Sequence, residues 1–362
     1  MPALFGLCPQ DGMLCEDSAH ILFDCIRKVM SSPIEEYGNG QCVDWQAFEL
    51  ADVVAAGRPR VLRGLCRDWP LVQAARLSHS AFAQALAALD SGAAVDVLHL
   101  PPEANGVVGY NASGDGFNYQ HFKVSLTEVL TRLAAFSRTP GAVPGVALQS
   151  AWIADCMPAF VAHHPMPCLP ATVSPRLWVG NRVTTPAHFD VSHNIAVAVC
   201  GQRRFTLFPT EQVANLYIGP LDFAPTGAAI TLARPDQPDL DRHPRLREAL
   251  DNALVAVLEP GDALYLPPLW WHQVESLDVL NGLINYWWMP PSMASGMDAL
   301  LLARLALHSL PAPLRENWRA LFEHYVFSDM AATHIPKQQR GVLGELDAQE
   351  AATLRERIKS AL

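Results

Sequence analysis

Basic residues are scarce in this sequence relative to acidic ones. It holds 26 Lys and Arg against 36 Asp and Glu, which gives a formal net charge of −10 at pH 7. Nucleic acid and anionic membrane surfaces attract cationic proteins over long distances, and a protein with this charge lacks that attraction. We therefore expect neither a membrane nor nucleic acid as the partner, although a local basic groove would not show in the net charge.

Long apolar runs and paired cysteines are also absent. No stretch reaches the roughly 18 uninterrupted apolar residues of a membrane-spanning helix. The first 20 residues lack the basic start and apolar run of a signal peptide. The eight cysteines form no CxxC pair and follow no regular spacing, which argues against a disulfide framework and a structural zinc site. These absences predict a cytoplasmic protein with reduced thiols.

Short β-rich runs dominate residues 145–290. Runs such as NIAVAVC, RRFTLFP, NALVAVL and LINYWWM alternate with Gly, Pro and Asn turns. Several short strands at this spacing predict a sandwich or barrel. An irregular insert over residues 222–251 interrupts them, and we expect it to lie outside the sheets as a loop near the barrel mouth.

Helical patterns flank this β region. Residues 45–136 mix short strands with helical segments, and SLTEVLTRLAAF begins with a capping box of Ser125 and Glu128. After residue 290 the pattern is helical again, and residues 293–310 are apolar almost all round. A helix of that kind must be covered by another surface, either the core or a second subunit. Residues 1–44 are an unassigned extension, although residues 18–30 fit one amphipathic helix.

The segment TTPAHFDVSHN places His188 and Asp190 two residues apart. Residues i and i+2 of a strand point to the same face, so both side chains would reach one site while Phe189 turns away into packing. By the same alternation, His193 would face away from that site and Asn194 toward it.

A third candidate ligand, His272, follows far downstream in PGDALYLPPLWWH. Distant strands become neighbours in a jelly roll, so the separation is compatible with one site. Two His and one carboxylate on one face of a metal form the facial triad of non-haem Fe(II) oxygenases, which leaves the opposite face open. An HxD pair by itself is a weak signal, and a metal-binding cupin without oxygenase activity stays an alternative.

Two long motifs together resemble the JmjC-type, cupin-like 2-oxoglutarate oxygenases. They are TTPAHFDVSHNIAVAVCGQRRFTLFP and PGDALYLPPLWWHQVESL. The resemblance is to the subgroup that contains factor inhibiting HIF and its bacterial relatives, and it covers about residues 45–290. GRPRVLRGLCRDWP is similar to the family's opening strand, and THIPKQQRGVLG to a C-terminal segment of the bacterial members.

The resemblance implies a mainly β fold with flanking helices. A double-stranded β-helix, the jelly-roll or cupin core, would occupy residues 45–292 together with N-terminal α/β elements. Residues 293–362 would form a C-terminal helical segment that makes a homodimer. The implied activity is Fe(II)- and 2-oxoglutarate-dependent hydroxylation of a C–H bond by dioxygen, on a protein side chain, with RNA or a small molecule as alternative substrates.

The resemblance also assigns residues. His188, Asp190 and His272 fall on the iron ligands. Thr185 and Arg203 fall where the family binds the far carboxylate of 2-oxoglutarate. Arg203 is a departure, because the asparaginyl hydroxylase has Lys there, and Arg offers two parallel N–H donors instead of a point charge.

Further positions carry weaker implications. Asn194 and Asn285 fall on pocket asparagines near the cosubstrate, and Tyr110 falls on a tyrosine that closes over it. Arg204 would face away from the pocket. Trp287 and Trp288 are interpreted as core aromatics.

Overall fold

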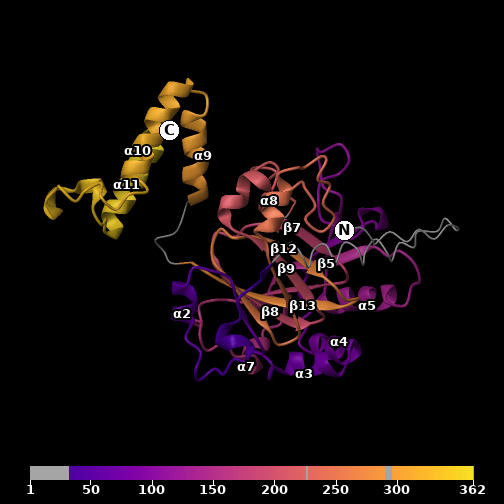
Figure 1. Ribbon diagram of the computed structural model, residues 1–362. Coiled ribbons are helices and arrows are strands. Elements are labelled where there is room, and N and C mark those ends of the chain that lie inside the picture. Colours follow the sequence, from indigo (N-terminus) through magenta and orange to yellow (C-terminus); the bar gives the residue numbers. More distant parts are fainter. Residues whose placement is uncertain (1–31, 226, 290–295, 362) are drawn as a thin grey trace, which may run out of the picture. The chain divides into compact units, whose positions relative to one another are not determined.

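The computed structural model describes residues 32–225, 227–289 and 296–361 (Figure 1). The chain divides into two compact units, Met1–Met289 and Pro290–Leu362. Part of the unassigned N-terminal extension, including the helix expected over residues 18–30, lies outside the described residues.

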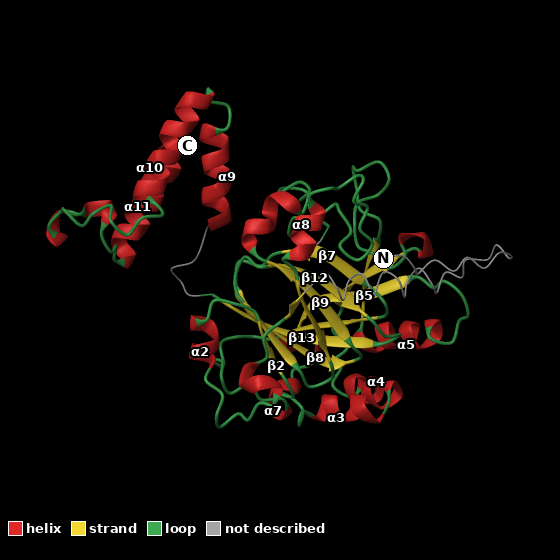
Figure 2. Ribbon diagram, in the orientation of Figure 1, coloured by secondary structure: helices red, strands yellow, loops and turns green. Residues whose placement is uncertain are grey.

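Two β-sheets form the centre of the first unit (Figure 2). The five-stranded sheet has the order β1 (Ser32–Pro33), β10 (Leu254–Leu258), β9 (Arg203–Phe208), β12 (Trp271–Ser276), β7 (Thr184–His188). The eight-stranded sheet has the order β2 (Arg60–Leu62), β11 (Ala263–Leu266), β8 (His193–Cys200), β13 (Asn281–Trp288), β6 (Arg176–Gly180), β5 (Gly145–Trp152), β3 (Val95–Leu100), β4 (Gln120–Val124). Neighbouring strands are antiparallel except for the β1–β10 pair. The predicted double-stranded β-helix core is confirmed.

Strand alternation divides the apolar residues between the two faces of each sheet. Ala196 of β8, Leu207 of β9 and Leu264 of β11 belong to one buried cluster between the sheets. The next residues along β8 point outward, so Val197 joins the cluster that includes Phe82 of the helical layer. Each sheet therefore has a buried face on both sides, which explains why the strands read as nearly continuous apolar runs.

Helices cover the outer face of the eight-stranded sheet. Ser78 and Ser125 cap two of them, since their side chains accept hydrogen bonds from the backbone N–H of Ala81 and Glu128. A turn over residues 45–47 precedes the first helix of this layer, which begins at Leu50. The helices of this unit are α2 (Leu50–Ala55), α3 (Pro70–Leu77), α4 (His79–Ala87), α5 (Leu126–Phe136), α6 (Ile153–Cys156), α7 (Phe160–His163), α8 (Leu246–Asp251).

The insert over residues 222–251 contributes no strand to either sheet within its described part. It ends in α8, and Leu246 packs with Phe208 and Trp271 on the outer face of the five-stranded sheet. The insert also reaches the interior, because Ala228 lines the cavity described below.

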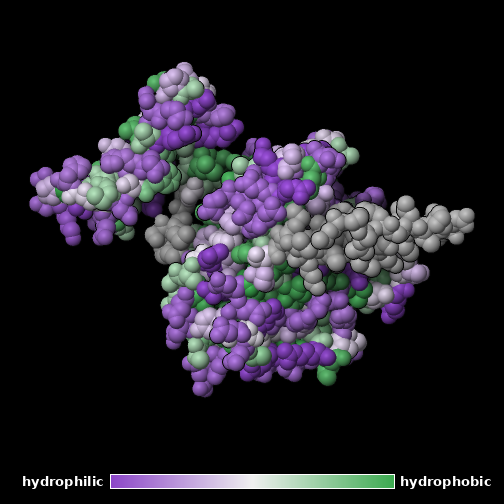
Figure 3. All heavy atoms as spheres, in the orientation of Figure 1, coloured by the Kyte–Doolittle hydropathy of each residue, from purple (hydrophilic) through white to green (hydrophobic). Residues whose placement is uncertain are grey.

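The second unit is helical. It contains α9 (Gly296–Leu307), α10 (Ala312–Tyr325) and α11 (Ala348–Ala361). In Figure 3, hydrophobic side chains lie among hydrophilic ones on the visible face of these helices. Across the described ranges, no helix combines the length and the apolar character that would be needed to cross a membrane.

Candidate metal centre

Two histidines from adjacent strands face each other inside the barrel. β7 and β12 pair antiparallel, and their register places His272 opposite His188, with ring centroids 4.3 Å apart. Asp190 joins them, and one ligand atom from each of the three residues lies within 4.8 Å of the others. The three side chains therefore converge on one point, as the motif spacing predicts.

Backbone contacts fix how the two imidazoles point. Nδ1 of His188 lies 2.9 Å from the carbonyl oxygen of Pro186, and Nδ1 of His272 lies 3.0 Å from that of Trp270. A carbonyl only accepts, so each Nδ1 carries the proton and each Nε2 presents its lone pair. Burial lowers the pKa of His272 to about 4, with repulsion from His188 as a second cause. His272 is therefore neutral at pH 7 and able to bind a metal.

Asp190 lies beyond the end of β7, in the short turn that leads to β8. Phe189 points away and meets Trp271 edge-on at 4.9 Å between ring centroids. The Oδ2 atom of Asp190 lies 3.7 Å from Nε2 of His272 and accepts a hydrogen bond of 3.0 Å from Nε1 of Trp287. This bond orients the carboxylate toward the two imidazoles.

The donor set fits a divalent transition metal. Two imidazoles and one carboxylate are the 2-His-1-carboxylate set of non-haem Fe(II) oxygenases, which leaves coordination positions open. Each of the three ligands has a hydrogen-bonded partner behind it, and such outer contacts hold metal ligands in place. Fe(II) is thus a group that these residues could hold.

A cavity of about 180 Å³ adjoins the three candidate ligands. A single water needs only about 10–15 Å³ on such a measure, so the cavity has room for a small molecule. Its wall also contains four of the residues that the resemblance assigns to the cosubstrate: Thr185, Asn194, Arg203, Asn285.

Arg203 supplies a buried positive charge in this wall. Only 8% of the residue is exposed, and its Nε atom has no hydrogen-bond partner among the described residues. Burial lowers the pKa of the guanidinium to about 10, so it stays charged at pH 7. Buried charges are normally paired, and an anion in the cavity would provide the missing partner. Arg204 pairs instead with Glu275, at 3.6 Å, as strand alternation predicts.

The two asparagines connect to the candidate metal ligands. Nδ2 of Asn285 donates to Oδ1 of Asn194 at 2.8 Å, and Nδ2 of Asn194 lies 3.4 Å from Oδ2 of Asp190. The two asparagines therefore support the carboxylate of Asp190 and also line the cavity.

Two assignments differ from the structure. Tyr110 does not reach the cavity: its hydroxyl donates a hydrogen bond of 2.6 Å to the carbonyl of Phe223, in a separate hollow. The interpretation of Trp287 as a core aromatic is wrong, because its indole lines the cavity and binds Asp190. Trp287 lies two residues after Asn285 on β13, so strand alternation indicates that both side chains face the cavity. Trp288 does pack against the core, and it stacks on His193, which faces away from the site.

Comparison with known proteins agrees with this geometry. The model of the family described as cupin-like domain matches residues 45–294. The chain belongs to the family of proteins with a cupin-like domain.

Curated relatives of this cupin-like protein share short segments with it. Lysine-specific demethylase JMJ31 of Arabidopsis thaliana is 31% identical over 142 residues, which are 38% of this chain and 25% of the relative. Jumonji C domain-containing protein 5 of Drosophila melanogaster is 33% identical over 120 residues, 33% of this chain and 28% of the relative. tRNA wybutosine-synthesizing protein 5 of Mus musculus is 32% identical over 116 residues, 31% of this chain and 34% of the relative. The chain thus matches about a quarter to a third of the length of these relatives.

Proposed function

We propose that this protein is an Fe(II)- and 2-oxoglutarate-dependent dioxygenase that hydroxylates a C–H bond on a protein side chain. The observation that carries the proposal is that His188, Asp190 and His272 line one cavity with a buried guanidinium, whose Nε atom has no hydrogen-bond partner among the described residues. A triad alone would suit many metal proteins. The guanidinium adds a site for an anion beside the metal, which 2-oxoglutarate requires and a simple metal-binding cupin does not.

Each residue has a defined task in this proposal. His188, Asp190 and His272 would hold Fe(II). Arg203 and Thr185 would bind the far carboxylate of 2-oxoglutarate. With dioxygen, bound iron and 2-oxoglutarate would supply the oxidant for the C–H bond, and 2-oxoglutarate would be converted to succinate and carbon dioxide.

Other residues of the cavity hold the candidate metal ligands in position. Asn194 and Trp287 hold the carboxylate of Asp190, so that its position relative to the two imidazoles does not change during turnover. The walls of the cavity would hold the cosubstrate and the substrate close to the reacting atoms.

A protein substrate agrees better with the charge of this chain than an RNA substrate does. The relatives differ in this respect, since one is named as a lysine-specific demethylase and another as a tRNA wybutosine-synthesizing protein. A net charge of −10 opposes binding of a polyanion. This argument supports a protein side chain as the target.

The C-terminal helices support a homodimer. Within the second unit itself, none of the residues of α9 and α10 is buried. Leu305 is 78% exposed, and Leu301, Trp318 and Leu321 are each at least 40% exposed. Apolar side chains gathered in this way mark protein–protein contacts. We infer that a second copy of the chain covers them.

Light scattering on the full chain tests the dimer. The wild type should give twice the mass of 39.6 kDa, and Leu305→Glu should shift it toward 39.6 kDa. Leu77→Glu is the matched control, because Leu77 is 81% exposed on α3 of the first unit. A wild-type monomer, or equal masses for all three proteins, would count against the dimer.

Anaerobic titration of 2-oxoglutarate into the Fe(II)-loaded protein tests the proposed activity. The wild type should develop the weak visible charge-transfer band of an iron-bound keto acid, and on exposure to air it should convert 2-oxoglutarate to succinate. His272→Ala should lose both signals. A protein that binds Fe(II) without a band or turnover would be a metal-binding cupin and not an oxygenase.

A further inference from the structure

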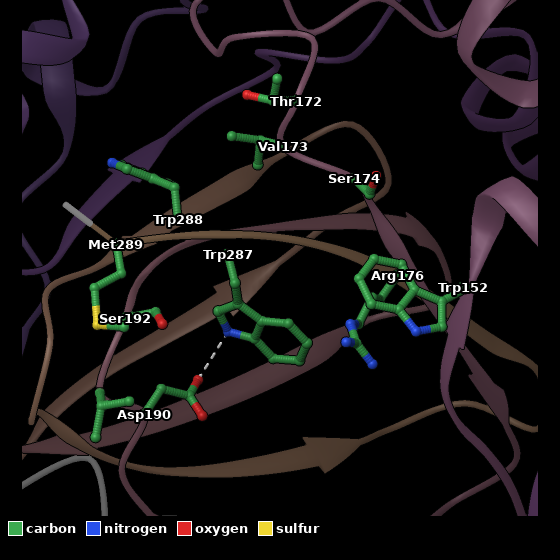
Figure 4. Close-up of a pocket in the computed structure, with 11 residues that line it drawn as sticks. Trp152, Thr172, Val173, Ser174, Arg176, Asp190, Ser192, Trp287, Trp288 and Met289 are labelled. Atoms are coloured by element: carbon green, nitrogen blue, oxygen red, sulfur yellow. Dashed lines mark hydrogen bonds between the residues drawn. The ribbon is translucent and has the colours of Figure 1, made fainter. Parts of the chain in front are cut away.

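A second, more open cavity of about 590 Å³ adjoins the candidate metal centre. Asp190 and Trp287 line both cavities, so the larger one leads directly to the metal ligands (Figure 4). Its remaining wall is partly apolar, with Trp152, Val191 and Met289 between 38% and 45% exposed. A substrate that reaches the metal through this cavity would contact these side chains.

One cationic side chain, Arg176, stands in this wall. Its guanidinium carbon lies 3.7 Å from the ring centroid of Trp152 and 5.7 Å from that of Trp287. Figure 4 shows the side chain beside both indoles. Stacking on flat aromatic faces holds the guanidinium plane in a defined orientation. The group is therefore preorganised before any ligand arrives.

A hydrogen bond to Ser150 fixes one end of the Arg176 guanidinium. Nη1 of Arg176 donates to Oγ of Ser150 at 3.1 Å. Ser150 has a φ of +49° and lies where the register of β5 against β6 shifts between Leu148 and Ala151. Bulges and left-handed non-glycine residues cluster at functional sites, where they aim a side chain. Here the bulge places Ser150 within hydrogen-bonding distance of Arg176.

The guanidinium of Arg176 has no counterion among the described residues. No carboxylate of the described chain forms an ion pair with Arg176. The side-chain hydrogen bonds of Arg176 to described residues both come from Nη1 and go to Ser150. Nε and Nη2 therefore remain available as parallel donors, in the geometry that matches a carboxylate. A charge kept unpaired in a cavity that leads to a reaction centre is poised for an incoming anion.

We propose that Arg176 binds a carboxylate of the substrate and thereby determines specificity, an inference that rests on the proposed function. The carboxylate would belong to an acidic side chain or a chain terminus of a peptide whose reactive C–H bond lies toward Asp190 and Trp287. The exposed indole of Trp152 and the apolar rim would contact the carbon skeleton beside it.

The charge of the cavity favours a carboxylate over a phosphate chain. Arg176 is the one Lys or Arg among the described residues that line it, and Asp190 adds a negative charge nearby. A nucleic-acid strand is bound through several phosphates at once and needs several cations. One guanidinium suits one carboxylate.

An array of capped seven-residue peptides tests the inference. Each peptide with Asp or Glu is paired with its Asn or Gln isostere, and each free C-terminus with its amide, so that the two carboxylate sources are separated. The protein is loaded with Mn(II) and N-oxalylglycine, which are inert to turnover. The wild type should retain carboxylate peptides roughly 10- to 100-fold better than their neutral partners, as expected for a charge-assisted pair.

Variants connect the preference to the residue. Arg176→Gln should abolish the preference, Arg176→Lys should keep a reduced one, and Arg176→Glu should favour Lys-containing peptides instead. Arg245→Gln is the matched control, because Arg245 also lies over an aromatic ring, 4.8 Å from the centroid of Tyr217, but outside the cavity. Thermal unfolding of every variant shows whether it is folded.

The outcomes are distinct. Equal retention of acidic and neutral peptides, a preference that survives in Arg176→Gln, or binding of a single-stranded oligonucleotide in place of carboxylate peptides would each overturn the assignment. The wild-type charge-transfer titration tests the proposed function by itself. A wild type that shows the band but no carboxylate preference would refute the role of Arg176 while leaving the oxygenase intact.

Discussion

Replacing Arg203 should have opposite effects on the empty protein and on cosubstrate binding. Its side chain is buried, and desolvation lowers its pKa well below the usual range of a guanidinium, to about 10. A shift of that size means that burial disfavours the charged form by about 3 kcal/mol. Arg203→Met removes the charge and keeps much of the apolar stem. We therefore expect the empty variant to be at least as stable to heat as the empty wild type.

Cosubstrate binding should fall sharply in the same variant. Removal of one partner from a buried, hydrogen-bonded charge pair costs about 2–5 kcal/mol, which corresponds to a Kd increase of roughly 30- to 5000-fold for 2-oxoglutarate. At a concentration about 100 times the wild-type Kd, the ligand stabilises the wild type by about 2.7 kcal/mol. The same concentration should stabilise the variant by less than about 1 kcal/mol.

Thermal unfolding with Mn(II), with and without 2-oxoglutarate, measures both effects. Arg203→Lys should recover much of the ligand-induced shift, because it restores the charge. The neighbouring Arg204→Met is the matched control, since Arg204 pairs with Glu275 on the opposite face of β9. It should lower stability and leave the ligand-induced shift unchanged. A full 2-oxoglutarate shift in Arg203→Met would refute the role of the guanidinium.

Two further predictions concern the metal ligands and the core. Trp287→Phe removes the hydrogen-bond donor to Asp190 and should weaken Mn(II) binding about 10-fold, as measured by electron paramagnetic resonance. Trp288→Phe is the control and should leave the affinity for Mn(II) unchanged. Equal Mn(II) affinities of the two variants would contradict the role of the Trp287 indole. Burial lowers the pKa of His164, whose Nδ1 donates to Phe160 and whose Nε2 accepts from the N–H of Leu71. The unfolded chain therefore binds more protons than the folded one below about pH 6.5, and stability should fall as the pH drops from there toward the folded pKa. His164→Gln should flatten this decline in melts between pH 7 and 5, and an unchanged slope would exclude His164 as its source.

Strand alternation predicts that His188 and Asp190 share one face, and the downstream motif adds His272 as the third candidate metal ligand. His188 and Asp190 are separated by a residue that packs the other way, and a jelly roll brings β12 beside β7, so the convergence with His272 follows from the motifs. The prediction about His193 also holds in the structure, but a turn intervenes between Asp190 and β8. The alternation of side chains along β7 therefore continues in β8, although the turn between them is not a strand.

Other features depend on contacts that no local pattern encodes. Tyr110 finds its partner in Phe223, more than a hundred residues away in the insert, and this packing decides where its hydroxyl points. The bulge at Ser150 and its contact with Arg176 likewise arise from the shifted register of β5 and β6. Trp287 differs from these, because strand alternation on β13 predicts that it shares the cavity face with Asn285.

A crystal structure with Mn(II) and N-oxalylglycine would test the central claim most directly. We expect one ion contacted by Nε2 of His188, Nε2 of His272 and the carboxylate of Asp190, with the far carboxylate of the ligand on the guanidinium of Arg203. An ion bound elsewhere, or a ligand whose carboxylate leaves Arg203 unpaired, would contradict it.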